Sequence, residues 1–154
     1  MIFHTSIAAD NPQAAAEFFA RLWNGRAYPF PPFADGSWIA MAGDERNSAI
    51  EIYPRGSQMH WGDNDAIEVQ NVIGTPTREA ANHSAIASPL STEEVLDCAA
   101  NAGFPARVCS RGPFRVIEVW IDGCTMFEVL PPDMQAEYLA SMTFEGWEAY
   151  LEAA

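Results

Sequence analysis

The sequence contains no lysine, and arginine supplies all eight of its basic side chains. Without lysine the chain cannot form a lysine Schiff base, and it cannot contain the phosphate-binding loop that depends on a lysine. Its 21 acidic residues give a formal net charge of −13. A charge of that sign repels nucleic-acid phosphates and anionic membranes, so we expect no nucleic-acid partner and no membrane association.

Cysteine is scarce as well, with Cys98, Cys109 and Cys124 widely spaced and no CxxC pair. This pattern is typical of reduced, mostly buried thiols in a cytoplasmic protein. The first residues show no basic segment followed by a long apolar run, so we expect no signal peptide. No stretch approaches the ~20 apolar residues of a membrane span. Apolar residues still make up 49% of the chain, which is enough for a globular core.

The first half predicts the order β-α-β-β-β, although its turn-rich segment at 25–36 contains a cluster of prolines that disfavours both helix and central strand. Asp10 or Asn11 can cap a helix whose first turn contains Pro12. The elements named from the pattern are a strand at 2–9, a helix at 10–23, and strands at 37–43 and 48–54.

The second half predicts the same order, which makes the chain an internal repeat. The predicted elements are a strand at 82–89, a helix at 90–103 with Ser91 or Thr92 as its cap and Gly103 as its stop, and strands at 106–111, 114–121 and 125–131. His4 opens the first half as HTSIA, and His83 opens the second as HSAIA. Glu51 follows His4 by 47 positions, and Glu128 follows His83 by 45.

These patterns predict one α+β domain over residues 1–132, composed of module one (1–54), a long polar linker (55–81) and module two (82–132). The linker contains one candidate short strand in AIEVQNV and a histidine, His60, that we expect to be a solvated loop residue. Residues 133–154 are predicted to form a C-terminal helical extension whose apolar side packs on the domain or on a second copy of the chain.

Both glutamates interrupt apolar strands. Strand alternation places Glu51 on the face opposite Ile50 and Ile52, and Glu128 opposite Phe127 and Val129. A buried carboxylate requires a partner, and no arginine lies beside either glutamate on its strand. A single His or Glu on a strand is usually structural, but four at symmetric positions favour a divalent metal ion between two imidazoles and two carboxylates. The hypothesis is a metal site formed by His4, Glu51, His83 and Glu128.

The segments HTSIAADNPQAAAEFFARL, AIEIYP and FEVLPP resemble the vicinal oxygen chelate superfamily, which includes glyoxalase I, fosfomycin-resistance and bleomycin-resistance proteins, and extradiol dioxygenases. The resemblance covers residues 1–132. It implies two βαβββ modules in a curved, eight-stranded mixed sheet, with His4, Glu51, His83 and Glu128 at the ligand positions of a Zn, Ni, Mn or Fe ion. It also implies a homodimer.

For activity, the resemblance implies a small substrate chelated through neighbouring oxygens, with lyase or isomerase chemistry through a metal-stabilised enolate. Glu128 is then the first candidate general base and Glu51 its counterpart. One alternative is a non-haem iron dioxygenase that uses His4, His83 and Glu128. Another is a binding protein without catalysis, of the resistance type, whose cavity Trp38 and Trp120 would line if they did not pack in the core.

Overall fold

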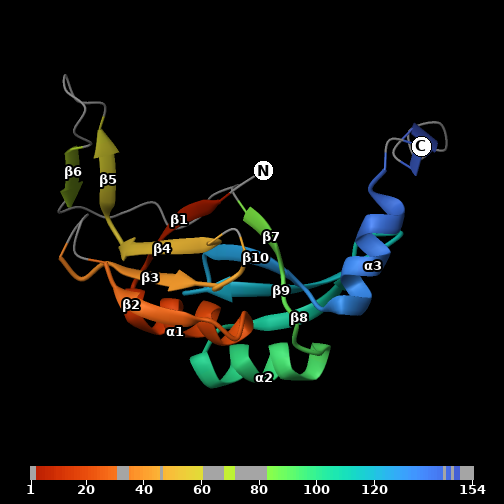
Figure 1. Cartoon of the computed structure of the whole chain (residues 1–154), viewed down its shortest axis with the longest axis horizontal. Helices are drawn as coiled ribbons and strands as arrows, with labels where there is room; N and C mark the ends of the chain where they lie inside the picture. The colour runs from red at the N-terminus through yellow and green to blue at the C-terminus, as the bar shows by residue number, and fades with distance from the viewer. Residues whose placement is uncertain are drawn as a thin grey trace. The chain divides into compact units, whose positions relative to one another are not determined.

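The computed structural model describes residues 3–30, 35–45, 47–60, 68–71, 83–143, 145–146 and 148–149 (Figure 1). The chain divides into two compact units, Met1–Ala81 and Asn82–Ala154. No helix in the described part of the chain is both long and apolar enough to cross a membrane.

The first unit contains a four-stranded sheet in the order β1-β4-β3-β2, with α1 packed against it. β1 pairs with β4 in parallel, and the other two pairs are antiparallel. A separate antiparallel hairpin, β5 with β6, lies in the predicted linker, and β6 falls within the strand predicted there. The elements are β1 (His4–Ala9), α1 (Pro12–Leu22), β2 (Arg26–Pro29), β3 (Trp38–Met41), β4 (Ala49–Pro54), β5 (Ser57–His60) and β6 (Glu68–Asn71).

The helix α1 begins where the sequence predicts it. The Asn11 side chain accepts a hydrogen bond of 3.0 Å from the backbone N–H of Ala14, and Pro12 occupies the first turn, where its missing N–H has no cost. Phe18, Phe19 and Leu22 are buried on the face toward the sheet. Their burial sets which face of the sheet becomes core.

The strand β2 corrects the sequence analysis, which treated residues 25–36 as a turn-rich segment. β2 is an edge strand that pairs only with β3 within its sheet. Pro29 can end such a strand because one side of an edge strand needs no backbone hydrogen bonds. Its presence completes the predicted β-α-β-β-β order.

The second unit repeats this arrangement in a sheet of order β7-β10-β9-β8, with β7 and β10 parallel. Ser91 and Glu94 form a capping box at the start of α2, and Gly103 ends that helix with φ of 75°. In Figure 1, α2 lies below this sheet and α3 rises beside its end. The elements are β7 (His83–Ala87), α2 (Thr92–Ala102), β8 (Ala106–Ser110), β9 (Arg115–Ile121), β10 (Thr125–Leu130) and α3 (Pro132–Ser141).

The prediction of an α+β fold with two βαβββ modules is confirmed, and its eight strands are present as two four-stranded sheets. The core of each unit lies on the helix side of its sheet, with Ile50 and Ile52 buried in the first and Phe127 and Val129 in the second. The helix α3 lies in the predicted C-terminal extension. The aromatic residues Phe144, Trp147 and Tyr150 lie outside the described residues.

Candidate metal centre

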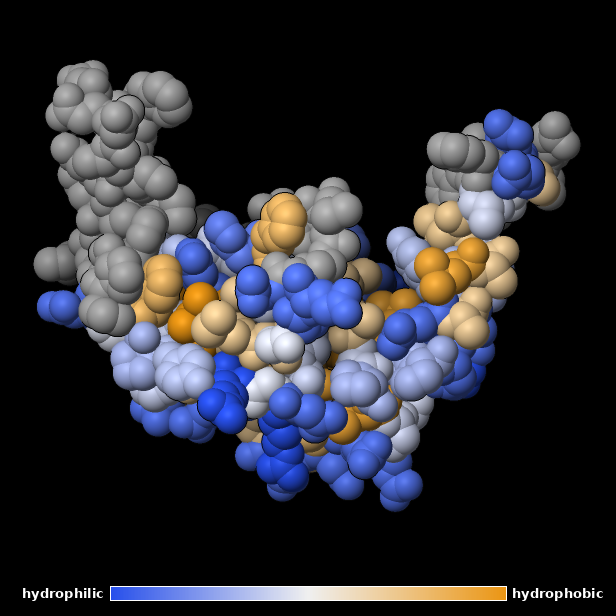
Figure 2. Space-filling model, viewed as in Figure 1, coloured by the Kyte–Doolittle hydropathy of each residue, from blue (hydrophilic) through white to orange (hydrophobic). Residues whose placement is uncertain are grey.

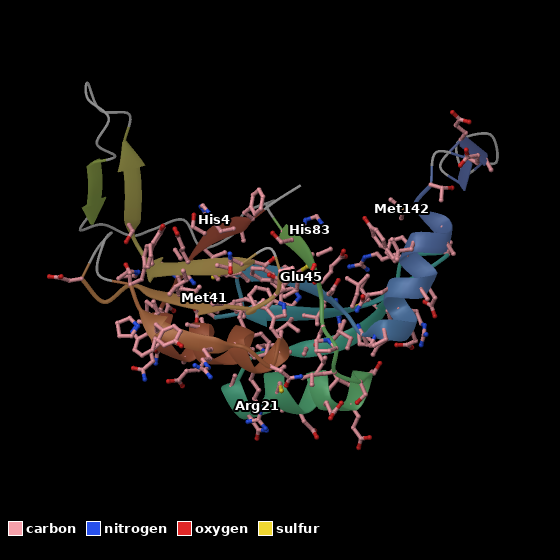
Figure 3. The ribbon with its side chains drawn as sticks, viewed as in Figure 1. His4, Arg21, Met41, Glu45, His83 and Met142 are labelled. Atoms are coloured by element: carbon pink, nitrogen blue, oxygen red, sulfur yellow. The ribbon has the colours of Figure 1, made fainter. Side chains whose placement is uncertain are left out.

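His4 and Glu51 lie on the same face of the first sheet. In the parallel pair β1–β4, His4 is opposite Ala49 and Ser6 is opposite Glu51, so the histidine and the glutamate are offset by two positions on neighbouring strands. Residues two apart on a strand share a face. Figure 3 shows the His4 side chain projecting from β1 away from α1. We call this pair the first half-site.

His83 and Glu128 have the same relationship in the second unit. His83 is opposite Met126, and Ala85 is opposite Glu128, so the offset is again two positions in a parallel pair. The His83 side chain projects from β7 away from α2 (Figure 3). This second half-site therefore repeats the first in strand pairing, register and face.

The donor set of the half-sites suits a divalent metal ion. Each half-site supplies one imidazole nitrogen and one carboxylate, the ligand types that bind Zn, Ni, Mn and Fe. A four-ligand site requires both half-sites. Among the residues that the structure describes, no group of three or more His, Cys, Asp or Glu side chains is placed to hold a metal ion. The four-residue set stays a hypothesis that the shared register supports.

Tyr53 is the partner of Glu51. Its phenol group lies two positions further along β4, is 5% exposed, and donates a hydrogen bond to the Glu51 carboxylate. Burial raises the pKa of the Tyr53 hydroxyl, and the nearby Glu51 carboxylate raises it further. Tyr53 therefore remains a neutral donor that fixes one Glu51 oxygen.

Glu118 is a site residue that the sequence analysis missed. It lies on β9 directly opposite Glu128 and is 6% exposed. One of its oxygens accepts from Arg111 Nη2 at 2.5 Å, and the other accepts from Arg107 Nη2 at 3.1 Å and Trp120 Nε1 at 3.3 Å. The hydrogen bond from Arg111 is the main cause that lowers the pKa of Glu118 to about 2.

Arg111 is a partner of Glu128 that comes from outside the strands of the two glutamates. It follows β8, and its Nε donates to Glu128 Oε1 at 3.0 Å while its Nη2 reaches Glu118. The bend after β8 brings it back over the sheet, where its backbone N–H donates to Phe114 O at 2.8 Å. The sequence signal was Glu118, the single acidic residue in the apolar strand FRVIEVWI, because a buried carboxylate there also needs a cation.

The structure also places the two tryptophans that were candidates to line a cavity, and the three cysteines. Trp38 is opposite Ile52 and shares its face, the core side, so it does not lie on the face of Glu51. Trp120 lies on the Glu118 face and donates to that carboxylate. Cys98 and Cys124 are buried, Cys109 is intermediate in exposure, and all three thiols are free.

The two repeated modules give the chain a glyoxalase-like fold. It is similar to the fosfomycin resistance protein FosX from Mesorhizobium loti, with 13% identity and a TM-score of 0.52 over 88% of this chain and 95% of that one. No protein-family model matches the chain, and no curated protein matches its sequence.

Two further solved structures are similar. FosX from Listeria monocytogenes, solved in complex with Mn(II) and sulfate, shares 12% identity and a TM-score of 0.53 over 91% of this chain and 96% of that one. The trypanothione-dependent glyoxalase I of Leishmania major shares 19% identity and a TM-score of 0.52 over 95% and 97%. At these identities the similarity shows the fold.

Proposed function

We propose that the chain is a divalent-metal-dependent enzyme of the lyase or isomerase type, acting on a small substrate that presents two neighbouring oxygens. The single observation that carries this proposal is the identical register of the two half-sites. His4, Glu51, His83 and Glu128 would hold the ion. The Mn(II) bound in the Listeria FosX structure supports a metal role for this fold.

A divalent ion held by these residues would act as a Lewis acid toward the substrate oxygens. The protein's part is to orient its ligands and to move a proton. Tyr53 fixes Glu51 through a neutral hydrogen bond, and Arg111 fixes Glu128 through an ion pair. Hydrogen-bonded partners of this kind orient metal ligands.

The two carboxylates differ in their neighbours. Glu128 is held in an ion pair with Arg111, whereas Glu51 accepts a hydrogen bond from the neutral Tyr53 phenol. Glu128 stays the first candidate general base and Glu51 its counterpart.

The test is metal content, measured by elemental mass spectrometry on tag-free protein. We expect about one divalent ion per chain in the wild type and loss of that ion in a His4→Ala, Glu128→Ala double variant. A Glu17→Ala, Glu93→Ala variant is the matched control, because both residues are exposed on helices. The proposal fails if the wild type binds no Ni, Zn, Mn or ferrous ion after dialysis against each.

Two alternatives each have an observation in their favour. Because Tyr53 gives Glu51 a protein partner, Glu51 could be structural, and His4, His83 and Glu128 would then be the two-histidine, one-carboxylate set of a non-haem iron dioxygenase. The FosX neighbours are fosfomycin resistance proteins and support the second alternative, a resistance-type protein that binds a small ligand without catalysis. Assembly as a homodimer and a cytoplasmic location are part of the proposal and rest on the resemblance and the composition.

A further inference from the structure

A pocket of about 260 Å³ lies within the second unit, between α3 and the strands β7 and β10. Its wall is made by residues of all three elements, and most of them are apolar. The lining residues are Ala85, Ile86, Ala87, Leu130, Gln135, Tyr138 and Leu139.

The strand side of the pocket continues the face that carries the second half-site. Ala85 is directly opposite Glu128, and Ala87 is opposite Leu130. His83 precedes Ala85 by two positions and shares its face. The pocket therefore begins at the strand position next to Glu128. The methyl groups of Ala85 and Ala87 leave the space that larger side chains would fill.

The helix that closes the pocket is fixed at both sides. Gln135 Nε2 donates to Leu130 O at 2.8 Å and to Ser88 O at 3.0 Å, which attaches α3 to the ends of β10 and β7. Arg115 on β9 pairs with Asp133 at 3.0 Å and also with Glu137. These contacts hold α3 in place without a ligand, so the pocket is preformed.

The lining selects an uncharged, apolar group. The Gln135 amide is already bonded to two carbonyls, and the acidic side chains of α3 are paired with Arg115. Leu139 is 72% exposed and Met142 43%, and Figure 2 shows apolar surface along α3. An apolar cavity of roughly 150 Å³ is enough to bind benzene. The present pocket has room for a six-membered ring with a few further atoms.

We propose that this pocket receives an apolar, ring-sized substituent of the substrate, while the substrate's neighbouring oxygens lie at His83 and Glu128. The inference rests on the proposed function and specifies its substrate class. The C-terminal extension would then determine specificity through Tyr138 and Leu139. The pocket's contact with the half-site face is the reason to assign it to the substrate.

The first experiment uses toluene as the probe and the metal-free full chain, so that it does not depend on metal binding. We expect toluene to shift the NMR signals of the Ala85 and Ala87 methyl groups. Leu139→Glu and Ala87→Leu should each weaken binding by about tenfold or more, because one introduces charge and the other fills the space. Ala140→Glu is the matched control, since Ala140 is exposed on α3 and does not line the pocket.

Absence of toluene binding, or equal loss in Leu139→Glu and Ala140→Glu, would overturn the inference. Because Leu139 is exposed, the Leu139→Glu variant keeps the test valid even if Ala87→Leu does not fold. Sedimentation of the same variants examines the competing occupant, a second copy of the chain. If Leu139→Glu converts a dimer to a monomer and toluene does not bind, the pocket is a subunit contact and the inference is wrong.

The second experiment compares mandelate with glycolate on Mn(II)-loaded protein by calorimetry. Both acids carry neighbouring oxygens, but only mandelate carries a phenyl ring. We expect mandelate to bind about tenfold more tightly than glycolate, and this preference to disappear in Leu139→Glu. Equal binding of the two acids in the wild type would overturn the inference. If toluene binds but Mn(II) does not, the proposed function fails while the apolar pocket is retained, so the two failures are distinguishable.

Discussion

Glu118 and Glu128 lie directly opposite each other on β9 and β10, and Arg111 donates to both, at 2.5 Å and 3.0 Å. Two carboxylates at such a position would repel each other if nothing lay between them. Arg107 and Trp120 hold the far oxygen of Glu118. Glu118 is therefore a fixed anchor for Arg111, and Arg111 in turn fixes the orientation of Glu128.

Removal of Arg111 should destabilise the second unit. Arg111→Met leaves two nearly buried carboxylates without their shared partner, and we expect a loss of about 2 to 3 kcal/mol in the free energy of unfolding. Urea unfolding measures this loss. Arg21→Met is the control, because Arg21 is exposed on α1, and it should change stability by no more than about 0.5 kcal/mol. Equal changes in the two variants would show that the bridge does not contribute to stability.

The lowered pKa of Glu118 predicts part of the loss of folding stability at low pH. Its pKa falls from an ordinary 4.5 to about 2 in the folded protein, so the folded state favours the ionised carboxylate. The resulting stability is present above pH 4.5 and is lost as the pH falls toward 2. In urea titrations across this range, wild type should lose more stability than Glu118→Gln. Parallel pH profiles for the two proteins would contradict this assignment.

Tyr53→Phe removes a single hydroxyl group, the one that donates a hydrogen bond to the Glu51 carboxylate, and leaves the aromatic ring in place. We expect a loss of about 1 kcal/mol in unfolding free energy, since a partly buried carboxylate loses a hydrogen-bond donor. Tyr28→Phe, at a tyrosine 42% exposed, is the control and should be nearly neutral. Spectroscopic titration supplies a second check. The two proteins, wild type and Tyr53→Phe, should show the same tyrosine ionisation at the pH where exposed phenols titrate, because the pKa of Tyr53 is raised.

Glu51→Gln distinguishes the four-ligand site from the three-ligand alternative. If Glu51 is a ligand, the variant should bind Mn(II) at least about tenfold more weakly than wild type, by calorimetry. His4→Ala and His83→Ala should weaken binding to similar extents, because the two half-sites share one register. Unchanged Mn(II) affinity in Glu51→Gln, with loss in both histidine variants, would favour the two-histidine, one-carboxylate set.

The local sequence determined where most helices and strands of this protein lie, and which face of its sheet each strand residue occupies. Helix caps at Asn11 and Ser91 and the strict alternation around Glu51 and Glu128 are short-range features, and the structure reproduces them. The internal repeat predicted two βαβββ modules, because equal patterns of apolar residues form equal layers. β2 was missed because its terminal Pro29 and the prolines that follow are tolerated at a sheet edge but not in a central strand, and strand order is not a local property.

Only the tertiary structure decided the partners of the acidic residues. Arg111 is distant from Glu128 in sequence, and the bend after β8 is what brings its guanidinium to both carboxylates. The pocket beneath α3 has the same origin, because the contacts of Gln135 and Arg115 place the helix over Ala85 and Ala87. Sequence periodicity shows which way a side chain faces, but a contact between distant segments depends on where the chain returns, and that is set by packing of the whole unit.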